Sequence, residues 1–349
     1  MNNTIRIGLI GAGGNTRAKH IPEFLAIPDV EIVAIANRTK ESAEAVSSAF
    51  DLSARVTVDP LDVINDPNID AICIGTWPYM HRDFTIASLN AGKHVLVEAR
   101  MSMNAAEAQE MLDTAQQNPS LVSQIVPAPM DFGSWRTINR LVNEGENGDL
   151  GTIRETHFSV LSGQGLNPNA PLHWRERTEY SGMNVMVYGI AVEIMERWLG
   201  PTESVIADGH TTINKKINPE TNSEIAIEIP DSLNVIARQM SGSRVIYRLS
   251  TITNDPEGTN GAVIYGSKGT LKWSFATDTL EFTPLDGQVA PMPHDEGTTA
   301  GWQVEVDFIN SIRLGNPVIL TNFLDGLNYM KVIEATYHSR REGRRVTIE

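Results

Sequence analysis

The sequence predicts an α/β protein in which a doubly wound parallel sheet is followed by an α+β domain with a large, mostly antiparallel open sheet. Residues 5–10 form a short, almost wholly apolar run, which is typical of a strand buried on both faces of a sheet. The run breaks on Gly11, Gly13 and Gly14, and residues 17–26 then have helical character. A strand, a glycine turn and a helix in this order indicate dinucleotide binding, because the glycines let the backbone approach a pyrophosphate and the helix N-terminus offers N–H groups.

Alternating strands and helices continue to residue 126 and predict the parallel sheet of the first domain. The strands are expected at residues 30–36, 69–75, 94–98 and 122–126, and the helices at residues 40–50, 61–64, 84–91 and 104–117. Pro127 and Pro129 end this pattern. We therefore expect a dinucleotide-binding domain over residues 1–126 and a second domain over residues 127–349.

The second domain has many short strands and few helices, which predicts an α+β architecture. Helices are expected at residues 135–144, 183–199, 302–314 and 325–342. Strands are expected at residues 153–161, 204–210, 232–240, 243–252, 261–265, 270–274, 279–283 and 346–348. A loop rich in Gly, Asn and Pro spans residues 162–173.

Composition excludes several classes of protein. The chain of 349 residues has a net charge of −15, and such an acidic surface repels nucleic acid. The single cysteine, Cys73, lies in an apolar run, which indicates a core thiol in a reducing compartment. We find neither a leader sequence nor an apolar run long enough to span a membrane, so we expect a cytoplasmic protein without a membrane partner.

The choice of cofactor depends on the end of the second predicted strand. Asn37, Arg38 and Thr39 stand there, about twenty residues after the glycines, where this fold places the residue that reads the ribose. An acidic residue would bind the 2′-hydroxyl of NAD and repel the 2′-phosphate of NADP, whereas here a neutral Asn precedes an Arg. This charge balance favours NADP. The alternative, in which Arg38 stacks on the adenine of NAD, stays open.

Further cofactor contacts are expected where strands end, because open α/β sheets bind ligands at the carboxyl ends of their strands. The glycine turn itself adds Asn15 and Thr16, the latter at the third position of the G-x-G-x-x-[GA] pattern. The other candidates follow the third and fourth predicted strands; they are Thr76, Trp77, Pro78, His81 and Glu98.

The motifs stand in the order of one known family. They are His20 after the glycine turn, Asp-Pro-Asn-Ile-Asp at 66–70, the turn of Thr76, Pro78 and His81, Ala-Gly-Lys-His-Val-Leu-Val-Glu at 91–98, the glycines 148 and 151, the pair Trp174-Arg175 and the turn at 265–270. With these motifs the chain resembles the glucose–fructose oxidoreductase / inositol dehydrogenase (Gfo/Idh/MocA) family over nearly its whole length. The resemblance implies an N-terminal Rossmann domain, a C-terminal sheet that forms a homodimer or homotetramer interface, and sugars, polyols or related carbohydrates as substrates.

The chain departs from the family at the positions that usually carry the chemistry. The family's Lys after the fourth strand corresponds to Ala99. Its helical Asp and His, four residues apart, correspond to Val187 and Ala191. The absence of all three polar side chains implies a different mechanism or none.

Hydride transfer at a carbon–oxygen bond needs a side chain that moves the hydroxyl proton. Tyr188 is the first candidate, because it adjoins the vacant Asp position and a phenol near Arg100 or Arg175 would have a lowered pKa. The alternative for Tyr188 is a packed helix residue with a satisfied hydroxyl. His173 is the second candidate, since it ends the Gly/Pro-rich loop, and its alternative is a solvated loop histidine.

Substrate contacts are expected near these two residues. Arg100 would orient a substrate carboxylate or a cofactor phosphate, and its alternative is a pairing with a helix acid. Asn184 lies one helical turn before Tyr188 in the predicted helix over 183–199 and would face the same way. Trp174 and Arg175 adjoin His173. The sequence His-Asp-Glu at 294–296 lies in a Pro/Gly loop and has no second ligand group at helical spacing, so we expect no metal site.

Three functions fit these observations. The first is an NAD(P)-dependent oxidoreductase acting on a sugar, polyol or related carbohydrate. The second is a lyase or glycosidase that retains NAD and oxidises the sugar only transiently, as some members of the family do. The third is a non-catalytic sensor of cofactor or sugar, which the three missing polar residues motivate.

Overall fold

The structure, a computed structural model, describes residues 4–128, 132–256, 258–297 and 301–349, so Pro129 lies outside the described residues. Its contacts divide the chain into unit 1, residues 1–130 and 302–327, and unit 2, residues 131–301 and 328–349. The boundary predicted at residue 126 placed residues 302–327 in the second domain. The structure corrects this prediction, because these residues belong to unit 1. The physical reason is packing: Val304, Phe308 and Ile309 are buried in the same apolar core as the strands of unit 1.

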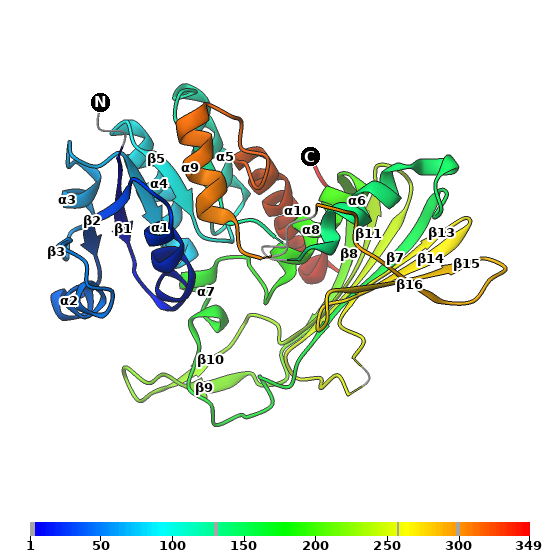
Figure 1. The fold of residues 1–349 in the computed structure, drawn as a ribbon. Helices are drawn as coiled ribbons and strands as arrows, with labels where there is room; N and C mark the ends of the chain where they lie inside the picture. The colour runs from blue at the N-terminus through cyan, green and yellow to red at the C-terminus, as the bar shows by residue number, and fades with distance from the viewer. Residues whose placement is uncertain (1–3, 129–131, 257, 298–300) are drawn as a thin grey trace. The chain divides into compact units, whose positions relative to one another are not determined.

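Unit 1 is a doubly wound α/β domain, as predicted (Figure 1). Its six-stranded sheet has the order β3-β2-β1-β4-β5-β6, and every neighbouring pair is parallel. The strands are β1 (Ile5–Ile10), β2 (Val30–Ala36), β3 (Arg55–Thr57), β4 (Ala71–Ile74), β5 (His94–Val97) and β6 (Ser123–Ile125). The chain order reverses between β1 and β4, which is where such sheets bind ligands.

The helices of unit 1 connect the strands. They are η1 (Thr16–His20), α1 (Ile21–Ala26), α2 (Lys40–Ala49), α3 (Pro60–Ile64), α4 (Pro78–Asn90) and α5 (Ala105–Gln117), with α9 (Val304–Leu314) added from the distant segment. The long helix α10 (Phe323–Glu342) begins in unit 1 and continues in unit 2.

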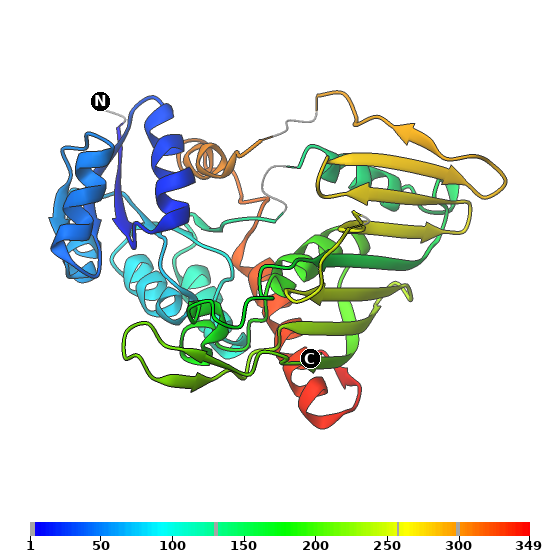
Figure 2. The same ribbon diagram turned by 90° about the horizontal axis from the view of Figure 1, so that it is seen from below.

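Unit 2 contains an open sheet of nine strands in the order β16-β15-β14-β13-β7-β12-β11-β8-β17 (Figure 2). All neighbours are antiparallel except β7 and β12, so the predicted, mostly antiparallel sheet is confirmed. The strands are β7 (Ile153–Leu161), β8 (Thr202–His210), β11 (Ser232–Gln239), β12 (Arg244–Ser250), β13 (Gly261–Gly266), β14 (Gly269–Ser274), β15 (Thr279–Pro284), β16 (Ala290–Met292) and β17 (Val346–Thr347). A separate hairpin, β9 (Lys215–Ile217) and β10 (Glu224–Ala226), was not predicted.

The nine-stranded sheet has one covered face and one open face. Along β11 and β12, buried residues alternate with exposed or half-buried ones, as the period of two in a strand requires. The helices of unit 2 are α6 (Ser134–Asn143), η2 (Gly145–Asn147), η3 (Trp174–Glu176), α7 (Thr178–Ser181) and α8 (Tyr188–Leu199). Of these, α8 contacts β12, and its residues Trp198 and Tyr188 pack against Trp273 and Tyr247 of the sheet.

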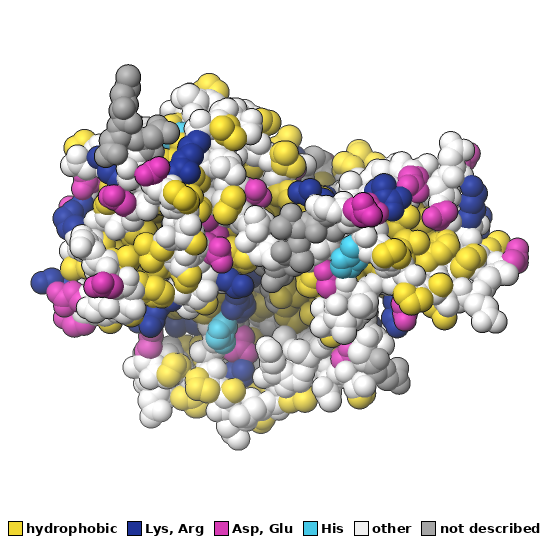
Figure 3. Space-filling view, viewed as in Figure 1, with side chains coloured by type: hydrophobic (Ala, Val, Ile, Leu, Met, Phe, Trp, Pro, Cys, Tyr) yellow, Lys and Arg dark blue, Asp and Glu magenta, His cyan; other side chains and the backbone are white. Residues whose placement is uncertain are grey.

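Within the described ranges, no helix combines the length and the apolar character needed to cross a bilayer. On the face drawn in Figure 3, acidic and basic side chains are interspersed among hydrophobic ones.

Candidate cofactor site and its surroundings

The glycine turn connects β1 to the first helix at the point where the strand order reverses. Gly11 has a φ of +83°, and a Cβ on it would lie 2.6 Å from Thr76 Cγ2 and 2.9 Å from the Thr76 backbone nitrogen. Only glycine fits this position. An added Cβ on Gly14 would meet no atom within 4 Å, and on Gly13 it would meet only the Gly11 oxygen at 4.0 Å. The backbone of the turn is therefore open on the side of these two residues, which fits the close approach of a pyrophosphate.

Thr16 replaces the third glycine of the pattern, and the structure shows how the fold accommodates it. Its hydroxyl donates to the Gly11 carbonyl at 3.1 Å. It also lies against Gly75, directly after β4, where an added Cβ would come within 2.1 Å of Thr16 Oγ1. The close contact between helix and strand that a third glycine normally permits is thus provided by Gly75 from the neighbouring strand.

The end of β2 supports the turn from the other side. Asn37 Oδ1 accepts the backbone N–H of Ala12 at 2.7 Å, so this side chain holds the glycine turn. Thr39 caps α2 by accepting the N–H of Ser42 at 3.2 Å. Arg38 is exposed beside them. Arg38 and Lys40 give this strand end positive charge, and the residues from Asn37 to Lys40 include no carboxylate.

A buried ionic network lies beside the glycine turn. His20 is fully buried and bonds through Nδ1 to Glu305 of α9 and through Nε2 to Glu98 Oε1 at 3.0 Å. Glu98 directly follows β5 and also accepts the side-chain amide of Asn15. Glu305 is fully buried too and accepts the indole N–H of Trp302. The network joins the first helix, the end of β5 and the distant helix α9.

The charges in this network stabilise one another. Burial by itself would lower the pKa of His20, but the hydrogen bonds to Glu305 and Glu98 outweigh burial and raise that pKa to about 9. Burial would likewise raise the pKa of Glu98, but His20 holds it below its usual range. At neutral pH a charged His20 therefore donates to two carboxylates, and Glu98 stays ionised next to Asn15 of the turn.

The turn after β4 contains the other predicted cofactor residues of unit 1. Trp77 is the residue before α4, and Pro78 is its first residue, as suits a helix start. His81 is fully buried, with its ring nitrogens 3.0 Å from the backbone oxygens of Thr76 and Arg100. His81 thus connects the ends of β4 and β5 instead of lining an open edge. Of these four side chains, Thr76 and Trp77 are half-buried.

Arg100 does not have the exposure expected of a substrate-binding residue. It follows β5 and is only 3% exposed. Its carbonyl oxygen lies 3.0 Å from Nδ1 of His81. The geometry within unit 1 therefore favours a role in holding the loop after β5.

Tyr188 does not have the environment of a proton carrier. It is 1% exposed, its hydroxyl bonds to Thr336 Oγ1 at 2.9 Å, and its ring packs edge-on against Tyr247 at 5.3 Å. Burial raises its pKa above the usual value, the opposite of the expected lowering. The structure thus corrects the predicted environment and favours the alternative, a packed tyrosine with a satisfied hydroxyl.

Asn184 and Tyr188 do not share a helix face, because α8 begins at Tyr188 and not at residue 183. Asn184 lies in the preceding loop, is buried, and donates to the Ser181 carbonyl at 2.7 Å. Val187 stands immediately before the helix, and Ala191 is buried in its first turn. Both of these positions therefore have apolar side chains that cannot transfer a proton.

The loop with His173 is held in place by a buried lysine that the sequence analysis did not single out. His173 Nδ1 accepts the N–H of Arg175 at 3.2 Å, and Glu176 accepts the N–H of His173 at 2.8 Å, which forms a reciprocal cap. Lys216 of the β9–β10 hairpin pairs with Glu176 at 2.6 Å. Trp174 lies between His173, at a ring distance of 5.7 Å, and the Arg175 guanidinium, at 4.4 Å. His173 and Arg175 are exposed.

Sequence reasoning missed several participants. Glu305 gave a weak signal, an acidic residue within the apolar pattern Val-Glu-Val at the start of a helix. Lys216 gave none, because its Glu176 partner lies 40 residues away. Among the described residues, no group of three or more His, Cys, Asp or Glu side chains is arranged to hold a metal ion.

The comparisons with known proteins agree with the geometry. Residues 5–125 match the oxidoreductase family with an NAD-binding Rossmann fold, and residues 146–348 match the C-terminal alpha/beta domain of the same family. The scyllo-inositol 2-dehydrogenase (NADP(+)) of Bacillus subtilis is 25% identical over 99% of this chain and 97% of its own. Levoglucosan dehydrogenase of Pseudarthrobacter phenanthrenivorans is 23% identical over 79% and 78% of the two chains.

Solved structures have the same fold. An oxidoreductase domain protein from Kribbella flavida superposes with a TM-score of 0.86 at 21% identity and 99% coverage of both chains. Levoglucosan dehydrogenase in complex with NADH and L-sorbose gives 0.84 at 20% identity, again with 99% coverage of both.

The fold and the glycine turn define a two-domain oxidoreductase with an NAD-binding Rossmann domain. Within that class, the chain belongs to the Gfo/Idh/MocA oxidoreductase family.

Proposed function

We propose that this chain is an NADP-preferring dehydrogenase or reductase of a sugar, polyol or related carbohydrate. The observation that carries the proposal is the glycine turn at the reversal point of the sheet, open at Gly13 and Gly14 and supported by Asn37. The names of the relatives supply the substrate class, since they are dehydrogenases of scyllo-inositol and levoglucosan. Those relatives are dehydrogenases, which favours turnover over a retained cofactor or a sensor.

The residues around the turn fit a dinucleotide. The backbone from Gly11 to Thr16 would bind the pyrophosphate, and Asn37, Arg38 and Thr39 would meet the adenosine ribose. The nicotinamide ring supplies the hydride acceptor or donor. Thr76, Trp77 and Glu98, at the ends of β4 and β5, are the proposed residues along the rest of the cofactor.

The proposed preference for NADP rests on charge. Asn37 is neutral and already engaged with Ala12, and Arg38 is the exposed cation next to it. A guanidinium binds a phosphate through two parallel hydrogen bonds, which suits the 2′-phosphate of NADP.

His173 is the proposed proton carrier. Partial desolvation of the ring and the charge of Arg175 lower the pKa of His173, so the imidazole is neutral near pH 7 and can take up a proton. Because Nδ1 accepts the Arg175 N–H, the neutral ring carries its proton on Nε2 and donates from there to a substrate oxygen. The ring takes up a proton at Nδ1 when the bond from Arg175 is released. Trp174 and Arg175 would contact the carbohydrate beside it.

We also propose an oligomeric state and a cellular compartment for the enzyme. The alternating exposed positions of β11 and β12, including Ile236 at 43% exposure, support assembly of a homodimer or homotetramer through the open sheet face. The buried Cys73 thiol is consistent with a reducing compartment such as the cytoplasm.

Separate titrations with NAD⁺ and NADP⁺ test the proposal first. We expect both to bind and NADP⁺ to bind more tightly. Turnover is then measured by reduced-nicotinamide absorbance with levoglucosan, myo-inositol, scyllo-inositol and L-sorbose. Tight cofactor binding without turnover on a broad carbohydrate panel would contradict the enzymatic proposal. Cofactor that never dissociates during turnover would contradict the dehydrogenase class.

A further inference from the structure

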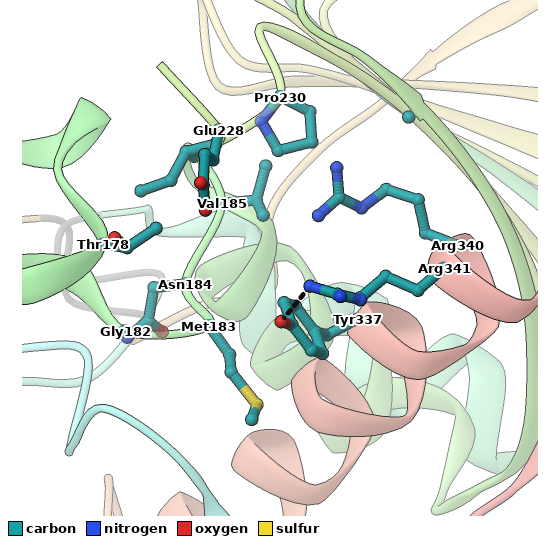
Figure 4. A pocket seen from close by; sticks show the side chains of 12 residues that line it. Thr178, Gly182, Met183, Asn184, Val185, Glu228, Pro230, Tyr337, Arg340 and Arg341 are labelled. Atoms are coloured by element: carbon teal, nitrogen blue, oxygen red, sulfur yellow. Dashed lines mark hydrogen bonds between the residues drawn. The ribbon is translucent and has the colours of Figure 1, made fainter. Parts of the chain in front are cut away.

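A pocket in unit 2 is separate from every residue assigned above to the cofactor. It has a volume of about 380 Å³, which lies within the range of small-molecule sites. Four segments line it: α7 with the loop that leads to α8, Gly209 of β8, the connection from β10 to β11, and the last turns of α10 (Figure 4). We call it the Arg340 pocket and define it by Asn184, Val185, Glu228, Tyr337, Arg340 and Arg341.

Two guanidinium groups from α10 enter this pocket. Figure 4 shows Arg340 and Arg341 extending from the helix toward the loop that carries Asn184 and Val185. Arg341 donates to the hydroxyl of Tyr337 at 2.7 Å and lies 5.3 Å from the centre of its ring. Arg340 is half-buried and lies 5.9 Å from the same ring. Two adjacent cations are thus held around one aromatic side chain.

No carboxylate neutralises this pair at close range. Among the residues that the structure describes, no ion pair within 4.0 Å involves Arg340 or Arg341, whereas the next arginine, Arg344, pairs with Glu342. Glu228 faces the guanidiniums from the opposite wall without forming an ion pair. Burial lowers the pKa of Arg340, and the nearby charge of Arg341 lowers it further. A bound anion would relieve this repulsion.

The backbone provides room for Arg340. Gly209 of β8 lines the pocket, and an added Cβ there would lie 2.6 Å from Arg340 Cδ and 3.2 Å from Pro230 Cγ. A side chain at position 209 would displace the arginine stem. Glycine at this strand position therefore leaves the space that the Arg340 stem occupies.

The rest of the wall indicates what accompanies the negative charge. Thr178 contributes a hydroxyl and Glu228 a carboxylate. Both groups are able to form hydrogen bonds with the hydroxyl groups of a ligand. Met183, Val185 and Pro230 supply apolar contacts. The local positive charge stands against a chain whose net charge is −15.

We propose that the Arg340 pocket binds a small hydroxylated carboxylate or phosphate, with Arg340 and Arg341 on its oxyanion and Glu228 on its hydroxyl groups. Forked guanidinium groups suit both anions. The inference does not rest on the proposed oxidoreductase activity, because it concerns binding in the absence of turnover.

The test is calorimetric titration of the full chain at low salt with three probes: D-gluconate, D-glucitol and inorganic phosphate. D-Glucitol matches gluconate except for the carboxylate. We expect gluconate or phosphate to bind and glucitol to bind at least tenfold more weakly, since a hydrogen bond to a charged group is worth roughly that factor. The tighter of the two anions identifies the class of ligand. Equal binding of glucitol, or no binding of either anion at millimolar concentration, would overturn the proposal.

Variants then assign the binding to the pocket. R340M and R341M retain the length of the stem and should each weaken the anion roughly tenfold. R244M removes an exposed arginine from β12 and should leave binding unchanged, so an equal loss in R244M would contradict the assignment. Glu228→Gln removes the one acidic side chain among the described residues of the pocket wall and should tighten phosphate binding, a gain that misfolding cannot produce. Cofactor titration of the same samples reports separately on unit 1.

Discussion

His20, near the start of the chain, bonds through Nδ1 to Glu305 of α9, which lies 285 residues further along the sequence. The pair is fully buried, and His20 Nε2 continues the network to Glu98 at the end of β5. A helix distant in sequence thereby becomes part of the dinucleotide-binding unit. The same contact makes the stability of unit 1 dependent on one proton.

The pH dependence of unfolding should report that proton. The folded-state pKa of His20 is about 9, above the ordinary value of 6.5. The stabilisation is therefore complete below pH 6.5 and is lost as the pH rises through 9. Over this window the free energy of unfolding should fall by up to about 1.4 kcal/mol per pH unit. Urea unfolding at a series of pH values from 6 to 10 measures the slope.

His20→Gln should be less stable than the wild type at pH 6 and should lack the slope. His338→Gln is the matched control, because His338 is only partly buried on α10, with carboxylate oxygens of Glu334 and Glu342 at 3.9 and 3.8 Å from its ring nitrogens. An unchanged slope in His20→Gln would show that another group titrates.

Gly75→Ala should damage both the fold and the cofactor site. The added methyl would meet Thr16 Oγ1 at 2.1 Å and the Gly11 backbone oxygen at 2.6 Å. Because a backbone oxygen cannot rotate away, we expect a loss of about 1–3 kcal/mol in unfolding free energy and weaker cofactor binding. Thermal unfolding and NADP⁺ titration measure the two effects.

Gly14→Ala separates these effects, since nothing lies within 4 Å of its Cβ position. It should keep the stability of the wild type while weakening the cofactor, because the methyl occupies the side that the pyrophosphate approaches. If Gly75→Ala has the same unfolding free energy as the wild type, the inference that Gly75 makes room for Thr16 is contradicted.

The two units differ in how far the sequence reveals them. Buried parallel strands have nearly continuous apolar runs, so β1, β2, β4 and β5 were predictable from local pattern. Glycines additionally mark the ends of β1 and β4. The placement of α9 in unit 1 depends on contacts such as His20 with Glu305, which no local pattern encodes. The start of α8 was misplaced because residues 183–187 are compatible with a helix, yet Met186 adopts a positive φ of 46°.

The candidate site divides along the same line. The glycine turn and Asn37 follow from motif and spacing, whereas the burial of Tyr188 and Arg100 depends on tertiary packing. A tyrosine beside a vacant catalytic position has the same sequence signature whether its hydroxyl faces solvent or Thr336.

Cofactor preference should follow the charge after β2. Asn37→Asp retains an oxygen that accepts the Ala12 N–H, so the turn should stay intact. The new carboxylate would repel a 2′-phosphate, and we expect the ratio of NADP⁺ to NAD⁺ affinity to fall at least roughly tenfold. Arg38→Ala should weaken NADP⁺ and leave NAD⁺ unchanged.

Lys40→Ala is the control for loss of positive charge, because its ammonium faces Glu44 at 3.4 Å on α2. It should leave the ratio close to that of the wild type. Equal losses for both cofactors in Arg38→Ala would favour the alternative in which the guanidinium stacks on adenine.

The final prediction concerns the proton. His173→Asn provides a side-chain oxygen that can accept the Arg175 N–H in place of Nδ1. Asn is also a favourable N-cap residue, which is the position that His173 occupies. The fold of the loop should therefore persist while the ability to carry a proton is lost. We expect kcat to fall by roughly a hundredfold or more, with the pH profile losing its acidic limb and cofactor affinity unchanged.

Tyr188→Phe is the comparison, since it removes the phenol hydroxyl that bonds to Thr336 within the core. It should cost about 1 kcal/mol of stability and leave kcat and its pH profile intact, because a phenol with a raised pKa holds its proton throughout the working range. The opposite outcome, a pH-dependent loss in Tyr188→Phe and none in His173→Asn, would return the chemistry to the tyrosine. Such a result would require unit 2 to expose Tyr188 during turnover, which hydrogen exchange of α8 would detect.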